Sequence, residues 1–215
     1  MIDLYCERLG PGLWAEPLNA ITNLAFAGAA WRLARLARTP AGVDRGVGGL
    51  AVLALALAIG SGLFHTVATP WTLVADVLPI LLFQLLVLLL WLQRRLGLAP
   101  LPAAGLCGLF LLASLAGRSV PNLLNGSLAY APTLAVLALL AWHDRRQGRG
   151  TALLVATALF SLSLVLRSLD NALCGVLPFG THLFWHLLNA EVLVLSGRAL
   201  GSVARNNGAI HVGRP

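Results

Sequence analysis

Long apolar runs dominate this sequence and restrict it to a helical membrane protein. An α-helix needs about 20 predominantly apolar residues to cross the hydrocarbon core of a bilayer. Seven such runs follow one another, separated by short connections rich in proline and glycine: 18–37, 48–67, 72–93, 101–118, 127–143, 151–168 and 182–203. Only 11% of the residues are charged, against about a quarter in soluble domains, so a soluble class is excluded. The sequence therefore predicts an all-α membrane protein, a bundle of seven transmembrane helices.

The arginines give this bundle an orientation. All 15 basic residues are arginine, and 12 of them follow or end an odd-numbered span. The three on the other side are Arg8, Arg118 and Arg167. By the positive-inside rule, the N-terminus lies outside and the C-terminus in the cytoplasm. Residues 1–17 then form an outer N-terminal segment, 18–203 the membrane domain and 204–215 a cytoplasmic tail. Because the positive charge reports topology, we do not infer a nucleic-acid partner from it.

Polar side chains inside the predicted spans gather at one depth. Ionisable groups are costly in a bilayer and are therefore candidates for function. In the predicted orientation, His65 lies at the outer end of the second span and Asp76 about one turn into the third. His182 and His186 occupy the first two turns of the seventh span. Residues four apart share one helix face, so these two histidines are neighbours, as are Ser61 and His65.

Three imidazoles from two helices provide the ligand set of a catalytic zinc site, which keeps a fourth position for water. We therefore predict that His65, His182 and His186 bind zinc. The Asp76 carboxylate would orient the water or accept its proton, and the Ser61 hydroxyl would hydrogen-bond the water or the substrate carbonyl. Asp76 has a second interpretation, as the structural partner of a donor on the sixth or seventh span.

The remaining polar residues at membrane depth have simpler interpretations. His143 lies beside "DRR" on the cytoplasmic side and is expected at the level of the lipid headgroups. His211 belongs to the tail and is expected in water. Asn189 and Glu191, in the seventh span, are expected to join neighbouring helices through polar contacts.

The three cysteines divide by location. Cys107 falls within the fourth span, where an unpaired thiol packs as a small apolar residue. Cys6 and Cys174 both fall on the outer side, where an oxidising compartment permits a disulfide. We hypothesise a Cys6–Cys174 bridge that ties the N-terminal segment over the bundle; two free thiols are the alternative.

These elements together resemble a known family. The segments "GSGLFHT", an aspartate eleven residues after that histidine, "HLFWH" in the last span and the opening "DLYCERLGPGLWAEPLNAITNLAF" are similar to the alkaline ceramidases. This family belongs to a wider group of seven-span membrane hydrolases that includes the adiponectin-receptor-like proteins. The resemblance covers essentially the whole chain.

The resemblance implies hydrolysis of the amide bond in a ceramide-like membrane lipid, which releases a sphingoid base and a fatty acid. It implies that His65, His182 and His186 ligate zinc and that Asp76 and Ser61 flank the catalytic water. It also implies a calcium site near the N-terminus, for which the nearest matches are Asp3, Glu7, Glu16 and Asn19. The alternative for Glu16 and Asn19 is that they cap the first span. The Cys6–Cys174 bridge is in keeping with the family.

The sequence is also compatible with other functions. The same zinc site could act on another membrane lipid, such as an N-acyl amide or an ester. A non-catalytic lipid receptor or a metal transporter is less favoured, because the polar cluster stays in the outer half of the spans and no long loop or signalling domain is present. The arginine-only, alanine- and leucine-rich composition indicates a bacterial inner-membrane protein with its site toward the periplasm. No protein partner is inferred.

Overall fold

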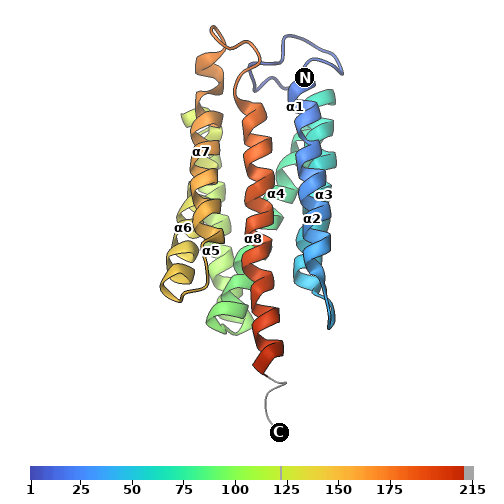
Figure 1. The fold of residues 1–215 in the computed structure, drawn as a ribbon. Coiled ribbons are helices and arrows are strands. Elements are labelled where there is room, and N and C mark those ends of the chain that lie inside the picture. The colour runs from blue at the N-terminus through green and yellow to red at the C-terminus, as the bar shows by residue number, and fades with distance from the viewer. Residues whose placement is uncertain (122, 211–215) are drawn as a thin grey trace.

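The chain forms a bundle of helices that lie side by side (Figure 1). The computed structural model describes residues 1–121 and 123–210. The helices are α1 (Pro17–Thr22), α2 (Leu24–Ala37), α3 (Arg45–Val67), α4 (Pro70–Leu96), α5 (Pro100–Arg118), the 3-10 helix η1 (Leu123–Tyr130), α6 (Ala131–Arg146), α7 (Ala152–Leu173) and α8 (His182–Ile210). Two short strands that the sequence did not predict, β1 (Arg38–Thr39) and β2 (Gly42–Val43), form an antiparallel pair between α2 and α3.

Five helical segments are long and apolar enough to cross a membrane, which is the composition of a multi-pass membrane protein. These are α3, α4, α5, the segment 123–146 that contains η1 and α6, and α7. The first and last predicted spans are not in this set. Asn23 separates α1 from α2, so neither helix reaches the necessary length. Helix α8 carries two histidines, an asparagine and a glutamate in its first three turns, and these lower its hydropathy.

The structure corrects two of the predicted boundaries. The fifth span was predicted to start at residue 127, but regular α-helix begins at Ala131. Three residues ahead of it, with φ values of 53°, 52° and 73°, have left-handed backbones that interrupt the helix: Leu124, Asn125 and Gly126. Helix α8 continues through Ile210, beyond the predicted end of the last span at residue 203. Residues 211–215, including His211, lie outside the described residues.

A tight connection makes α3 and α4 antiparallel neighbours. Helix α3 ends at Val67, and the residue that follows, Ala68, has a left-handed backbone with a φ of 48°. Thr69 and Thr72 then form a capping box, and Pro70 occupies the first turn of α4, where its missing N–H costs nothing. Because only two residues separate the helices, the last turn of α3 and the first turns of α4 lie at the same end of the bundle.

Close packing at Gly60 fixes how α3 and α4 face each other. A Cβ atom at this position would overlap the carbonyl group of Ala75, so only glycine permits the observed approach. Ser61 and Asp76 follow these two residues directly and are both buried. The close contact therefore places the hydroxyl and the carboxylate at the same level of the α3–α4 interface. The N-terminal segment and the start of α8 lie at this same end, the upper end in Figure 1.

Candidate metal centre

Three histidines from α3 and α8 meet at this end of the bundle. His65, His182 and His186 are all buried, and each offers a ring nitrogen that lies within 4.8 Å of the others. Within the described residues, this is the one group of three or more His, Cys, Asp or Glu side chains close enough to share a metal ion. The sequence prediction brought together these same three residues.

The imidazole rings have the spacing that a tetrahedral metal requires. Their centroids are 5.3 Å apart for His65 and His182, 4.8 Å for His65 and His186, and 4.8 Å for His182 and His186. A zinc ion about 2.0–2.1 Å from a ring nitrogen lies about 3.2 Å from that ring's centroid, so three tetrahedrally arranged rings have centroids about 5 Å apart. The observed ring spacings are close to this value.

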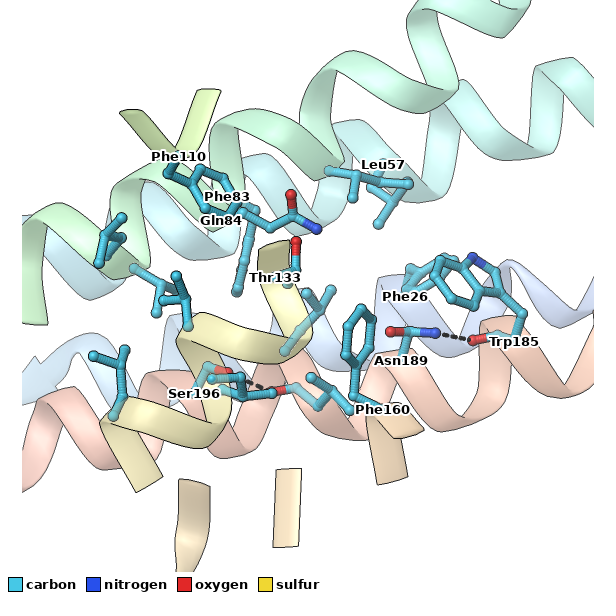
Figure 2. Close-up of a pocket in the computed structure, with 18 residues that line it drawn as sticks. Phe26, Leu57, Phe83, Gln84, Phe110, Thr133, Phe160, Trp185, Asn189 and Ser196 are labelled. Carbon is cyan, nitrogen blue, oxygen red and sulfur yellow. Dashed lines mark hydrogen bonds between the residues drawn. The ribbon is translucent and has the colours of Figure 1, made fainter. Parts of the chain in front are cut away.

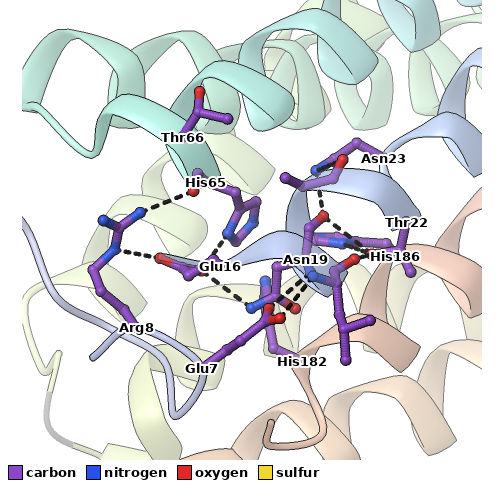
Figure 3. Close-up of polar contacts among 12 residues, drawn as sticks. Glu7, Arg8, Glu16, Asn19, Thr22, Asn23, His65, Thr66, His182 and His186 are labelled. Atoms are coloured by element: carbon purple, nitrogen blue, oxygen red, sulfur yellow. Dashed lines mark hydrogen bonds and ion pairs between the residues drawn. The ribbon is translucent and has the colours of Figure 1, made fainter. Parts of the chain in front are cut away.

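A buried carboxylate sets the orientation of His65. Glu16 Oε2 lies 2.5 Å from His65 Nδ1, and Glu16 Oε1 accepts a hydrogen bond of 2.5 Å from Arg8 Nε. Figure 3 shows Glu16 between these two side chains. With Nδ1–H donated to the carboxylate, the lone pair of His65 lies on Nε2, which is buried and has no partner within the described part of the chain. A carboxylate behind a histidine is the usual support of a metal ligand.

The other two histidines are also held in place. Thr22 Oγ1 lies 2.8 Å from His186 Nδ1 and donates its own proton to the carbonyl of Leu18 at 2.8 Å, which assigns the Nδ1 proton to His186. The ring of His182 stacks on Tyr5, with centroids 3.6 Å apart and an interplanar angle of 16°. Its Nδ1 is buried without a partner among the described residues. Buried imidazole nitrogens that lack partners are costly unless a ligand satisfies them, so the donor set fits a metal ion.

Asp76 and Ser61 line a cavity of about 270 Å³ together with His182 and His186. This volume is far larger than the roughly 30 Å³ that one water molecule occupies in the liquid. The predicted catalytic pair and two of the predicted ligands therefore face one shared space. Tyr5 also borders the cavity. Burial raises the pKa of the Tyr5 phenol, so its hydroxyl stays neutral and can donate a hydrogen bond there.

The N-terminal segment is fastened over the cluster. Cys6 and Cys174, the predicted pair, are joined by a disulfide with Cα atoms 5.3 Å apart. Asp170 of α7 accepts hydrogen bonds from the backbone N–H groups of Cys6 at 3.1 Å, Thr181 at 2.6 Å and His182 at 2.9 Å. One carboxylate thus caps the start of α8 and holds the segment that carries Tyr5.

Three of the four residues predicted to bind calcium, Glu7, Glu16 and Asn19, make hydrogen bonds within the protein, and calcium binding stays a prediction. Asp3 is exposed. Glu7 accepts hydrogen bonds from the backbone N–H groups of Leu18 at 2.6 Å and Asn19 at 2.8 Å, so it caps α1 from outside the helix. Glu16 binds Arg8 and His65 and makes no side-chain capping bond. The alternative that the side chains of Glu16 and Asn19 cap the first span is wrong, because Glu7 provides the capping hydrogen bonds.

Several residues of the site were not predicted from the sequence. Tyr5, Arg8, Thr22 and Asp170 support the histidines through contacts between segments that are distant in the chain. Arg167 borders the same cavity and was interpreted only as a topology signal. The one available hint was that Arg8, Arg118 and Arg167 depart from the distribution of the other arginines.

The polar residues expected to join helices do so. Asn189 of α8 donates a hydrogen bond of 3.1 Å to Ser163 Oγ of α7. Glu191 of α8 forms an ion pair with Arg32 of α2, with a shortest distance of 2.5 Å. His143 lies on α6, where its ring contacts Trp91 of α4 with centroids 4.9 Å apart.

Comparison of the chain with models of protein families, with curated proteins and with solved structures finds no significant match.

Proposed function

We propose that this protein is a zinc-dependent hydrolase that cleaves the amide bond of a ceramide-like membrane lipid and releases a fatty acid and a sphingoid base. The observation that carries the proposal is the trihistidine cluster, with two ring tautomers set by Glu16 and Thr22, beside Asp76 and Ser61 in one cavity. The resemblance to the alkaline ceramidases supports the same reaction and the same five residues.

An apolar cavity of about 70 Å³ (Figure 2) adjoins the polar one. The two cavities share Phe26, Leu57, Ile80 and Trp185. Leucine, valine and phenylalanine side chains form most of the deeper wall. A lipid with its scissile bond beside the histidines would place an acyl chain in this cavity and bury apolar surface, at about 25 cal/mol per Å². This continuity favours a lipid substrate over a small soluble one.

The chain's own residues divide the work of amide hydrolysis. Asp76 would accept a proton from the attacking water and return it to the leaving amine, as a general base and then a general acid. Ser61 would donate a hydrogen bond to the carbonyl oxygen as negative charge develops there. Tyr5 would shield His182 from bulk water by its stacked ring. When bound, the zinc ion would polarise the carbonyl and lower the pKa of the water.

The proposal includes seven spans, with α1 and α2 together forming the first and α8 the last. The arginine distribution supports an orientation with the N-terminus and the metal centre on the outer side, and the membrane would be a bacterial inner membrane. The Cys6–Cys174 disulfide supports this side, because disulfides persist in oxidising compartments. The site would lie just below the headgroups, at the depth of a ceramide amide.

Metal analysis of the purified protein, run in parallel with release of fatty acid from a labelled ceramide, tests the proposal. We expect about one zinc per chain and metal-dependent release. His182→Ala should lose both metal and activity. Asp76→Asn should keep the metal and lose about 10²- to 10⁴-fold in rate, the range for a general base.

His143→Asn is the matched control, since it removes a histidine outside the cluster and should change neither quantity. Full activity of a metal-free His182→Ala protein would overturn the proposed mechanism. Metal-dependent cleavage of another N-acyl lipid or an ester, with ceramide left intact, would keep the hydrolase and replace the substrate.

A further inference from the structure

Two arginines with no acidic partner border the cavity of the metal centre. Arg118 ends α5 and Arg167 lies on α7, and both line the space that Asp76, His182 and His186 line. Among the described residues, neither guanidinium has a carboxylate oxygen within 4.0 Å, whereas Arg8, Arg32 and Arg94 each form an ion pair. An unpaired arginine that faces an enclosed space is costly unless it has a ligand.

The surroundings of Arg167 hold its guanidinium without neutralising it. The rings of Tyr5, Tyr130 and Trp185 surround it, with centroids 5.8, 5.6 and 5.5 Å from its central carbon. Its Nη1 donates a hydrogen bond of 3.2 Å to the backbone carbonyl of Asn125. Aromatic faces and a carbonyl position a cation but leave its net charge. Among the described residues, the remaining N–H groups of the Arg167 guanidinium have no hydrogen-bond acceptor, so they can bind a ligand.

The nearby carboxylates are engaged elsewhere. Asp170 accepts hydrogen bonds from three backbone N–H groups, as described above. Asp76 faces Ser61 and His65 and acts on Arg167 only through space. Neither acid forms an ion pair with Arg118 or Arg167, so the cavity presents two guanidinium groups from different helices.

The backbone beside Arg167 is shaped for this contact. Asn125 has a left-handed backbone with a φ of 52°, which is rare for a residue with a side chain. Besides accepting from Arg167 through its carbonyl, Asn125 donates a side-chain hydrogen bond of 3.1 Å to the Arg167 carbonyl. These two hydrogen bonds fix the Arg167 backbone and guanidinium against the turn at Asn125.

We propose that Arg118 and Arg167 form a subsite for an oxyanion carried on the headgroup of the lipid substrate, a phosphate or a carboxylate close to the scissile amide. Guanidinium groups match these anions through paired, planar hydrogen bonds, and a neutral hydroxyl headgroup offers no such partner. This inference rests on the proposed function, since it assigns the headgroup class of the same substrate. It favours an anionic N-acyl lipid over an unmodified ceramide.

Binding can be measured without hydrolysis. The probe is hexadecyl phosphate, which has a phosphate headgroup, an apolar tail and no amide, added to the zinc-loaded protein in nanodiscs of zwitterionic lipid. We expect Arg118→Gln and Arg167→Gln to raise its Kd about 10- to 100-fold, the effect of losing one or two charge-assisted hydrogen bonds. Arg167→Lys keeps the positive charge but loses the planar guanidinium, so it should give an intermediate Kd. A misfolded protein would show no binding, which distinguishes the two causes.

Arg145→Gln is the matched control, because Arg145 is exposed at the opposite end of α6 and its removal should leave the Kd unchanged. Equal affinity in the wild type and both cavity variants would overturn the subsite. If His182→Ala lost binding while both arginine variants kept it, the phosphate would bind the metal, and the subsite would also be overturned. Inorganic phosphate that binds as tightly as hexadecyl phosphate would overturn the assignment to a lipid.

The two proposals can fail separately. Arginine-dependent binding of hexadecyl phosphate with no fatty-acid release from any lipid would sustain the subsite and refute the hydrolase. Release of fatty acid at equal rates from a ceramide and from the same ceramide phosphorylated on its headgroup, both unaffected by Arg118→Gln, would sustain the hydrolase and refute the subsite.

Discussion

Replacing Glu16 by glutamine should weaken metal binding although Glu16 touches no metal. Its carboxylate accepts hydrogen bonds from Arg8 at 2.5 Å and Asn19 at 3.1 Å and lies 2.5 Å from His65 Nδ1. A glutamine side chain has a single acceptor oxygen, and the charged guanidinium of Arg8 is the stronger donor, so the oxygen would stay with Arg8 and the N–H₂ group would face His65. His65 would then lose the partner that fixes its tautomer, and its Nε2 would no longer be reserved for the metal.

The expected magnitude follows from burial. The side chains of Glu16 and His65 are 1% and 0% exposed, so water cannot replace the lost bond. Loss of such a partner behind a metal-binding histidine reduces metal affinity about 10- to 100-fold, or about 1.4–2.7 kcal/mol. Arg8, also 1% exposed, would be left without its full counter-charge. Breaking a buried pair of this kind costs about 3–5 kcal/mol of stability.

Competition with a chromogenic chelator measures the zinc Kd, and thermal unfolding in the same detergent measures stability. Glu7→Gln is the matched control: Glu7 lies in the same segment and is buried, but it binds backbone N–H groups and no histidine. It should lose about 1 kcal/mol, as for other helix caps, and keep the zinc Kd. A Glu16→Gln protein that unfolds at the wild-type temperature and binds zinc with wild-type affinity would refute the reasoning.

Three further perturbations probe the scaffold. Gly60→Ala should destabilise the protein by about 1–3 kcal/mol through overpacking between α3 and α4, whereas Gly62→Ala, with open space around its Cβ, should be neutral or stabilising in thermal unfolding. Cys6→Ala should lower the melting temperature and the zinc affinity by releasing the N-terminal segment, whereas Cys107→Ser, at a free cysteine, should leave the zinc affinity unchanged. A hydrogen bond from Arg94, in the last turn of α4, lowers the pKa of Asp44 below its usual value. The stability that the ionised Asp44 contributes is therefore complete above the unfolded pKa of about 3.9 and is lost as the pH falls through the lower folded pKa. Melting temperatures of wild type and Asp44→Asn should accordingly differ at pH 6 and converge below pH 4; a constant difference would contradict this assignment.

The histidine cluster was predictable because the membrane makes polar residues conspicuous. A bilayer removes most ionisable side chains from the spans, so His65, His182 and His186 stand out against leucine, valine and alanine. Helical spacing then placed two of them on one face, and the alternation of span direction placed the third at the same depth. These arguments need only the length and direction of each helix, which the apolar runs supply.

The support of the cluster was not predictable by the same arguments. The contact between Glu16 and His65 joins residues 49 positions apart, and that between Thr22 and His186 joins residues 164 positions apart. No periodicity relates a residue of an irregular segment to a residue of a helix, so the partners of Glu16 follow only from the folded chain. The interruption ahead of α6 had a local signal, the Asn125–Gly126 pair, which is typical of turns.

From the sequence alone, an arginine that departs from the positive-inside distribution cannot be told apart from one that is needed at a binding site, and Arg167 is an example. Arginines are scarce on the outer side of a membrane protein, so the three exceptions can be read as noise in a topology signal. In the folded chain, one of them, Arg8, neutralises Glu16 and thereby supports His65. The other two, Arg118 and Arg167, line the cavity and form no ion pair among the described residues. All three exceptions to the charge rule therefore lie at the candidate metal centre. In the predicted orientation, each of these arginines weakens the charge difference that orients the protein in the membrane. A role at the candidate site would explain why they are present.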